Sequence, residues 1–338
     1  MALLRVGACL SLSGRYARFG LQAAHGLDAW RRLDGGAKVL VEDDGSDPTR
    51  LEPAIRRMSG ACDLLLGPYS TRLVLAAGRV LPDLGRLLWN HGGAGEDAQL
   101  ACPGLIVSVL APAGRYAEPF VRLAAATAEP APLWIAHGRG SFGRQVAAGA
   151  ATAARRLGLR TARLGPGEAL SRREGEGAWD LMTAGSFEED VARFEEARQL
   201  ARPPRLVCAV AAGVREFQAA VTDPEGTYGV AQWFDGQEPP SEPDLGPGPA
   251  SFHQAYEAVA GTPPDYPAAQ AAAAAVVATH CARTAGGLDV RSLWSAATGL
   301  DTTTLFGPFR VDPASGAQIA HRTVLLRWGP EGLVRARS

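Results

Sequence analysis

Short apolar runs typical of β-strands alternate with longer amphipathic runs typical of helices along most of this chain. Parallel strands cannot be joined by tight hairpins, so this alternation predicts parallel sheets with helices packed on both faces. One series of strands is expected at 4–10, 38–42, 63–66, 86–89 and 105–109, and a second at 133–136, 160–164, 180–183, 206–210 and 228–232. The intervening helices are expected at 22–33, 49–58, 71–84, 142–157, 188–200 and 214–221. The pattern therefore predicts an α/β protein with Rossmann-like sheets.

The two series of strands predict two domains, since 338 residues exceed what a single hydrophobic core usually supports. Residues 237–249 are rich in proline and glycine and predict a linker. Helices are expected again at 252–259 and 268–285. The simplest explanation for helices after the linker is that the chain returns to the first domain. The last segments, 305–316 and 323–328, are interpreted as two strands around a turn.

Charge and composition exclude several function classes. The formal net charge of −1 gives no general attraction to nucleic acid or to an anionic membrane. The longest apolar run, 268–278, is too short to span a bilayer. Five scattered cysteines lack C-x-x-C spacing, and six histidines form no H-E-x-x-H motif, so no metal and no cofactor are expected.

A glycine motif at 138–143 matches G-x-G-x-x-G after a strand and at the start of a helix. Dinucleotide binding also requires an acidic residue at the end of the next strand, and Leu164-Gly165-Pro166 supplies none. The chain also has no G-x-S-x-G nucleophile motif. The acidic residues Glu188, Glu189 and Asp190 are expected in the first turn of a helix, where negative charge interacts favourably with the helix dipole. The protein is therefore expected not to be an enzyme, and a nucleotide-dependent enzyme is the least favoured alternative.

Polar turns follow the first strands of the chain and lead directly into helices. A Ser/Gly turn at 11–14 follows the first strand, and Tyr69-Ser70-Thr71 follows the third. Open α/β sheets bind ligands at the carboxyl ends of their strands, where helix N-termini offer N–H donors. A helix cap formed by Ser70 or Thr71 is the alternative explanation, and both roles are compatible.

The order of these motifs resembles the type I periplasmic binding proteins of the branched-chain amino-acid and amide group. The resemblance runs from Val6 through 307–312. It implies two Rossmann-like lobes, one made of 1–110 plus 248–303 and the other of 111–240 plus 304–338. Three connecting segments, near 111–112, 237–249 and 301–306, would form a hinge that closes on a ligand.

The resemblance also assigns ligand contacts. The first lobe would contribute Phe19, Tyr69, Ser70, Thr71, Asn90, His91, Gly92, Gly93 and Ala94. The second lobe would contribute Ser141, Phe142, Ser186, Phe187, Ala212 and Gly213. Amino-acid binders of the family carry a hydroxyl where Ala94 stands and an acidic residue near the turn at 211–213. Here Ala94 lacks the hydroxyl, and Glu216 stands one helical turn beyond the turn at 211–213, so the site is expected to be aromatic and weakly charged.

The expected function is non-catalytic binding of a small amino-acid-like, amide or carboxylate compound, as the substrate-binding component of an ABC transporter. Its partners would then be the ligand and a membrane permease. The alternative is a cytoplasmic sensor of the amide-sensor type that acts on a regulatory protein. The resemblance places the protein outside the cytoplasm, whereas no signal peptide precedes the first strand, so either a leader was removed or the protein stays in the cytoplasm.

Overall fold

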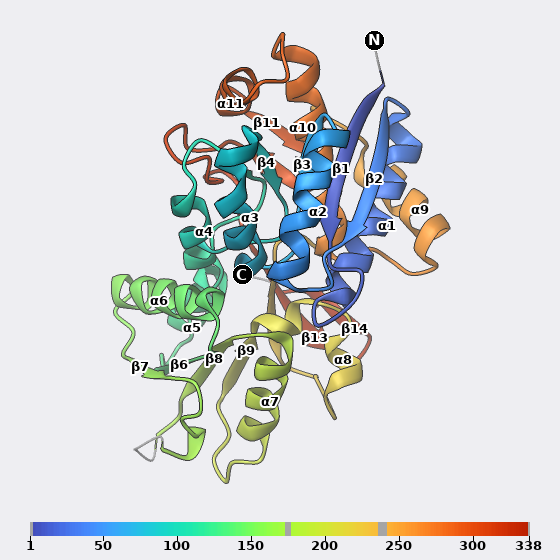
Figure 1. Cartoon of the computed structure of the whole chain (residues 1–338). Helices are drawn as coiled ribbons and strands as arrows, with labels where there is room; N and C mark the ends of the chain where they lie inside the picture. Colours follow the sequence, from blue (N-terminus) through green and yellow to red (C-terminus); the bar gives the residue numbers. More distant parts are fainter. Residues whose placement is uncertain (1–2, 173–176, 236–241, 337–338) are drawn as a thin grey trace. The chain divides into compact units, whose positions relative to one another are not determined.

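A computed structural model describes residues 3–172, 177–235 and 242–336 (Figure 1). Its contacts divide the chain into two units. The first consists of Met1–Pro112 and Asp235–His321, and the second of Ala113–Phe234 and Arg322–Ser338. The chain passes from one unit to the other three times, and each unit contains its own sheet.

The first unit is built on a five-stranded parallel sheet with the order β2-β1-β3-β4-β5. Its strands are β1 (Leu4–Leu10), β2 (Ala37–Asp43), β3 (Leu64–Leu66), β4 (Leu88–Asn90) and β5 (Ile106–Ser108). Helices α1 (Ala17–Asp34), α2 (Pro48–Ala61), α3 (Thr71–Leu84) and α4 (Glu96–Ala101) follow strands β1 to β4 in turn. The expected α/β architecture is confirmed.

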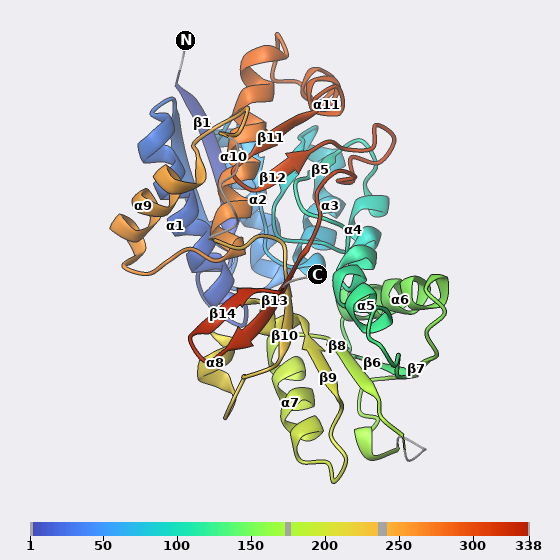
Figure 2. The same cartoon turned by 180° about the vertical axis from the view of Figure 1, so that it is seen from behind.

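After the second crossing, the chain adds α9 (Pro249–Ala260), α10 (Tyr266–Thr284) and α11 (Val290–Thr298) to the first unit. Figures 1 and 2 show α1, α9 and α10 on one face of the sheet and α2 and α3 on the other. Helix α10 is buried along most of its length, because its alanines allow close approach. A side chain at Gly26 of α1 would collide with the backbone of Ala268.

The second unit contains a seven-stranded sheet with the order β14-β13-β10-β9-β8-β6-β7. Its parallel part comprises β6 (Leu133–His137), β7 (Thr161–Leu164), β8 (Asp180–Ala184), β9 (Leu206–Ala209) and β10 (Tyr228–Ala231). Strands β13 (Val324–Gly329) and β14 (Gly332–Arg335) extend it antiparallel. The helices are α5 (Glu118–Ala125), α6 (Ser141–Arg156), α7 (Phe187–Arg198) and α8 (Phe217–Ala220).

The interpretation of the last segments as one pair of strands was wrong. Strand β12 (Gly307–Phe309) pairs with β11 (Thr302–Thr304), whereas β13 pairs with β10 and β14. Residues 304–321 also group with the first unit, although they were expected in the second. Long-range hydrogen bonds explain this grouping, because Ser108 N–H donates to the Gly316 carbonyl and Gln318 Nε2 donates to that of Val109.

Smaller differences concern the ends of elements. Helix α1 begins at Ala17 rather than 22, so Phe19 lies inside the helix and not in the preceding turn. The helix expected at 214–221 is reduced to α8. Of the predicted linker, residues 237–241 lie outside the described residues, and Pro249 already begins α9. In the described part of the chain, no helix is both long and apolar enough to cross a membrane.

Candidate functional site

The loop after β4 in the first unit is held together by Asn90, the only asparagine in the chain. Its Oδ1 accepts from the N–H groups of Gly92 and Gly93, at 3.1 and 2.9 Å. Its Nδ2 donates to the Gly93 carbonyl and to Ser108 Oγ, both at 2.8 Å. All four bonds go to other groups of the protein, so the Asn90 side chain fixes the conformation of the loop. Its predicted contact with a ligand stays a prediction.

The turn after β3 is joined to the same loop. Ser70 N–H donates to the Gly92 carbonyl at 2.9 Å, and Gly95 N–H donates to Thr71 Oγ1 at 2.9 Å. Ser70 also caps α3, because its Oγ accepts from Leu73 N–H at 3.3 Å. Its φ of 87° is unusual for a residue with a side chain and is fixed by these bonds. Capping is thus established for Ser70, and ligand contact by Ser70 and Thr71 stays a prediction.

Gly92 and Gly93 are required by packing. A Cβ atom at Gly92 would lie 2.5 Å from Tyr69 Cα, and one at Gly93 would lie 2.5 Å from Val74 Cγ2. The two strand-end turns therefore meet through their backbones, which only glycine permits at these positions. This packing brings the predicted residues 69–71 and 90–94 together at the carboxyl ends of β3 and β4.

Four half-buried aromatic residues form a cluster beside these turns, hereafter the aromatic cluster: Tyr16, Phe19, Tyr69 and Tyr266. The rings of Phe19 and Tyr69 are stacked, with centroids 4.6 Å apart and an interplanar angle of 13°. The Tyr16 ring lies 6.1 Å from that of Tyr69. The hydroxyl of Tyr266, at the start of α10, lies 3.0 Å from the hydroxyl of Tyr69. Phe19 and Tyr69 were predicted to belong to one site, whereas Tyr16 and Tyr266 were missed.

His91 is fully buried in the first unit, and neither of its ring nitrogens has a hydrogen-bond partner. Burial lowers the pKa of His91 to about 4, so the ring is neutral at physiological pH. Its Nε2 lies 3.5 Å from where a Cβ of Gly67 would stand, beneath the turn after β3. His91 is therefore an uncharged part of the loop's interior, and its ligand contact stays a prediction.

Two aspartates organise the Ser/Gly turn after β1. Asp43 Oδ1 accepts from the N–H groups of Leu12 and Ser13, at 2.9 and 3.1 Å. Asp44 is fully buried and accepts from Ser11 Oγ at 2.7 Å, and burial raises the pKa of its carboxyl group. The turn that precedes α1 and the aromatic cluster is therefore fixed by carboxylates from the end of β2.

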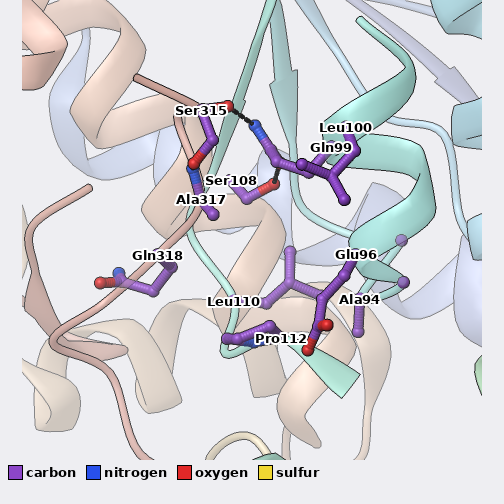
Figure 3. Close-up of a pocket in the computed structure, with 12 residues that line it drawn as sticks. Ala94, Glu96, Gln99, Leu100, Ser108, Leu110, Pro112, Ser315, Ala317 and Gln318 are labelled. Atoms are coloured by element: carbon purple, nitrogen blue, oxygen red, sulfur yellow. Dashed lines mark hydrogen bonds between the residues drawn. The ribbon is translucent and has the colours of Figure 1, made fainter. Parts of the chain in front are cut away.

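A pocket of about 180 Å³ lies against α4 in the first unit and is here named the α4 pocket. Gly93, Ala94 and Gly95 are among its lining residues, and Figure 3 shows Ala94 on one side and Ser315, Ala317 and Gln318 of the C-terminal segment on the other. Leu110 and Pro112 lie between them, close to the point where the chain leaves this unit. The pocket therefore borders the predicted ligand loop but contains no member of the aromatic cluster.

The strand-end loops of the second unit are tied together by Glu189. Its carboxylate accepts from the N–H groups of Arg139 and Ser186, at 3.0 and 2.9 Å. Ser186 caps α7 in return, since its Oγ accepts from Glu189 N–H at 3.2 Å. A side chain at Gly138 would collide with the Glu189 carboxylate, and one at Gly143 with the Ala184 carbonyl. The glycine motif thus serves loop packing, and the Glu189 carboxylate, which accepts from the Arg139 N–H of the motif, would repel a phosphate.

Asp190 lies beneath the turn at 211–213, where sequence reasoning found no acidic residue. Its carboxylate accepts from Thr183 Oγ1 at 2.9 Å and from Ala211 N–H at 3.0 Å. Burial raises the pKa of Asp190 to about 7. The helical spacing from Ser186 could have indicated an inward-facing position, but the sequence could not show which turn it reaches.

The other predicted residues of the second unit lie at the ends of its parallel strands. Ser141 and Phe142 begin α6, Phe187 begins α7, and Ala212 and Gly213 belong to the turn after β9. The ring of Phe142 packs edge-on against that of Tyr116, with centroids 5.2 Å apart. The structure places these residues on neighbouring loops of one sheet edge, and their ligand contacts stay predictions.

Neither metal ligands nor reactive thiols stand out in the described residues. They contain no group of three or more His, Cys, Asp or Glu side chains that could hold a metal ion. The five cysteines are buried free thiols, and burial raises the pKa of each. A buried thiol with a raised pKa is a poor nucleophile.

Comparison with known proteins assigns this arrangement to a family. A family model described as periplasmic binding protein matches residues 4–332. A leucine-binding protein from Thermotoga maritima superposes with a TM-score of 0.80 at 13% identity, covering 99% of this chain and 98% of its own. A solute-binding protein of an ABC transporter from Rhodopseudomonas palustris HaA2, in complex with p-hydroxybenzoic acid, gives 0.81 at 15% identity, with coverages of 99% and 96%. No curated protein matches the chain in sequence.

Proposed function

Because the chain belongs to the periplasmic binding protein family, we propose that it is the substrate-binding component of an ABC transporter and that its ligand is a small aromatic carboxylate. The transport role is supported by similar structures, which include solute-binding proteins of ABC transporters. Members of this family typically act outside the cytoplasm, and the comparisons give no support to the regulator-coupled alternative.

The aromatic cluster beside two hydroxyl groups is the observation that carries the choice of ligand. The stacked rings of Phe19 and Tyr69 offer a flat surface to which a planar ring can add. Offset stacking contributes about 0.5–1.5 kcal/mol beyond the buried area. An aliphatic amino-acid side chain would gain only the free energy of burying its apolar surface, without the contribution from stacking.

The carboxylate of the ligand would be bound by Ser70 and Thr71. Each hydroxyl oxygen already accepts from a backbone N–H, and each still has its own proton to donate. Hydrogen bonds to a charged acceptor are stronger than neutral ones. The N-terminus of α3 adds a favourable dipole for a negative group.

An α-amino acid fits these residues less well. Ala94 supplies no hydroxyl for an ammonium group, and the turn at 211–213 carries no carboxylate on its own residues. Asp190, which accepts from the Ala211 N–H of that turn, is almost fully buried, and both of its oxygens accept bonds from the protein. Neighbours in complex with 4-hydroxybenzoate and with leucine have TM-scores of 0.81 and 0.80, so overall similarity does not choose between the two ligands and the proposal depends on the local residues.

Calorimetry with the unfolded, washed and refolded protein tests the ligand class. 4-Hydroxybenzoate and benzoate are expected to bind at least tenfold more tightly than leucine and isoleucine. Phe19→Leu keeps the apolar volume but loses the ring, and is expected to weaken benzoate binding about two- to tenfold. Ala94→Ser, in contrast, should improve leucine binding relative to the native protein. Tighter binding of leucine than of either aromatic acid by the native protein would overturn the choice of ligand.

Transport requires a separate measurement. Uptake of the radiolabelled acid that binds in calorimetry should fall when the gene is deleted from the source organism, and a plasmid copy should restore it. Unchanged uptake in the deletion strain would refute the transport role while leaving the ligand assignment standing.

A further inference from the structure

We propose that the α4 pocket is a second binding site, which takes a small ammonium compound with an apolar body. All twelve residues that line it belong to the first unit, and none belongs to the aromatic cluster, although Gly93 and Ala94 are shared with the predicted ligand contacts. A volume of about 180 Å³ suits one ring or a short alkyl chain, because a cavity of about 150 Å³ holds benzene.

The interior of the pocket is apolar in effect, because the side chains of Gln99, Ser108 and Gln318 are already hydrogen-bonded, mostly to backbone carbonyls. Gln99 Nε2 donates to the carbonyls of Ile106 and Ser315, and Gln99 Oε1 accepts from Ser108 Oγ at 2.6 Å. Gln318 Nε2 donates to the Val109 and Pro308 carbonyls. What remains for an occupant is the surface of Ala94, Leu110, Pro112 and Ala317. The body of the ligand must therefore be apolar.

The side chains that α4 adds to the pocket supply the remaining chemistry. Leu100 is 68% exposed, and it follows Glu96 by four residues, so both lie on one face of the helix. Figure 3 shows the Glu96 side chain extending toward Leu110 and Pro112. An ammonium group would meet the Glu96 carboxylate while its apolar body is covered by Leu100. Burial by a ligand would also account for an unusually exposed leucine beside an apolar pocket.

A buried hydrogen-bond chain joins the α4 pocket to the predicted ligand loop. It runs from the N–H groups of Gly92 and Gly93 through Asn90, Ser108 and Gln99 to the carbonyl of Ser315. Ser108, Gln99 and Ser315 all line the pocket. An occupant that shifts them would alter the loop, and binding at the two sites would then be coupled reciprocally. This coupling rests on the proposed function, whereas binding at the α4 pocket does not.

The binding step is tested with phenethylammonium as the probe, by calorimetry and by protein-observed NMR. The neutral 2-phenylethanol, of similar shape, is expected to bind about two- to fivefold more weakly, the contribution of an exposed ion pair. Glu96→Gln should weaken phenethylammonium by the same factor and leave 2-phenylethanol unchanged. Leu100→Ala should weaken both probes about three- to tenfold, which reflects partial burial of one leucine.

Leu288→Ala is the matched control, because Leu288 is also an exposed leucine of the first unit, at 43%, and lies outside the pocket. The proposal is overturned if the native protein binds neither probe at 10 mM, or if Leu100→Ala behaves as the control does. Unfolding is not a concern for these variants, since both leucines are exposed.

Coupling is measured by titrating 4-hydroxybenzoate with and without saturating phenethylammonium. The proposed coupling predicts a shift of about fivefold or more in the 4-hydroxybenzoate affinity, and a smaller shift in Leu100→Ala. Equal affinities would refute the coupling alone. Failure of 4-hydroxybenzoate to bind would instead count against the proposed function, and the probe titrations would still decide the second site.

Discussion

Replacing Asn90 by alanine should destabilise the first unit through a single loop. The Asn90 side chain makes four hydrogen bonds and is almost completely buried. Alanine removes all four and leaves the N–H and C=O groups of Gly93 without their side-chain partner. Gly92 is only half-buried, so its N–H group can turn to water at lower cost.

The magnitude follows from the two stranded groups of Gly93. A buried polar group that loses its partner costs about 1–3 kcal/mol, and the lost packing of the side chain adds to this cost. Ser108 keeps its bond to Gln99 and contributes less. We therefore expect Asn90→Ala to lower the free energy of unfolding of the first unit by about 3 kcal/mol.

Urea unfolding followed by circular dichroism measures this loss, and hydrogen exchange by mass spectrometry locates it. A peptide that covers residues 88–95 should exchange faster in Asn90→Ala, whereas peptides from α7 should not change. Gln254→Ala is the control, because Gln254 is an exposed amide of α9, where a change within about 0.5 kcal/mol is expected. If the urea midpoint of Asn90→Ala equals that of Gln254→Ala, the four hydrogen bonds do not hold the loop and the reasoning is refuted.

Three further predictions concern single groups. Thr71→Val strands the Gly95 N–H and should cost about 1–3 kcal/mol in thermal or urea unfolding, whereas Thr71→Ser should keep most of the stability. Because the pKa of Asp190 is raised, its carboxyl group is protonated in the native state and ionised in the unfolded state between about pH 4 and 7. The contribution of this proton to stability is therefore lost as pH rises through 7. Asp190→Asn should reduce the fall in melting temperature between about pH 4 and 7, measured in a series of thermal melts, and an unchanged slope would contradict the prediction. Tyr266→Phe removes one of two paired hydroxyls and should alter benzoate affinity less than Phe19→Leu does, a ranking that calorimetry checks.

The loops that meet at the predicted site could be foreseen in part from the sequence. The strand-end positions of Tyr69 and Gly92 followed from the alternation of strands and helices, because parallel strands place their carboxyl ends at one edge. The helix predicted at 71–84 corresponds to α3 without any shift. The roles within the loops could not be read in this way. The predicted contact of Asn90 with a ligand stays a prediction, whereas its hydrogen bonds to its own loop and to Ser108 on β5 were not foreseen.

By itself, the sequence determined the order and type of most elements, since hydrophobic period and turn residues act over a few positions. Tertiary structure alone decided that 304–321 belong to the first unit and that Tyr266 meets Tyr69 across 197 residues of chain. It also decided that Asp190 supports a turn of the next strand rather than only its own helix. The physical reason is that such contacts depend on where distant segments pack, and local propensity carries no information about a partner so far along the chain.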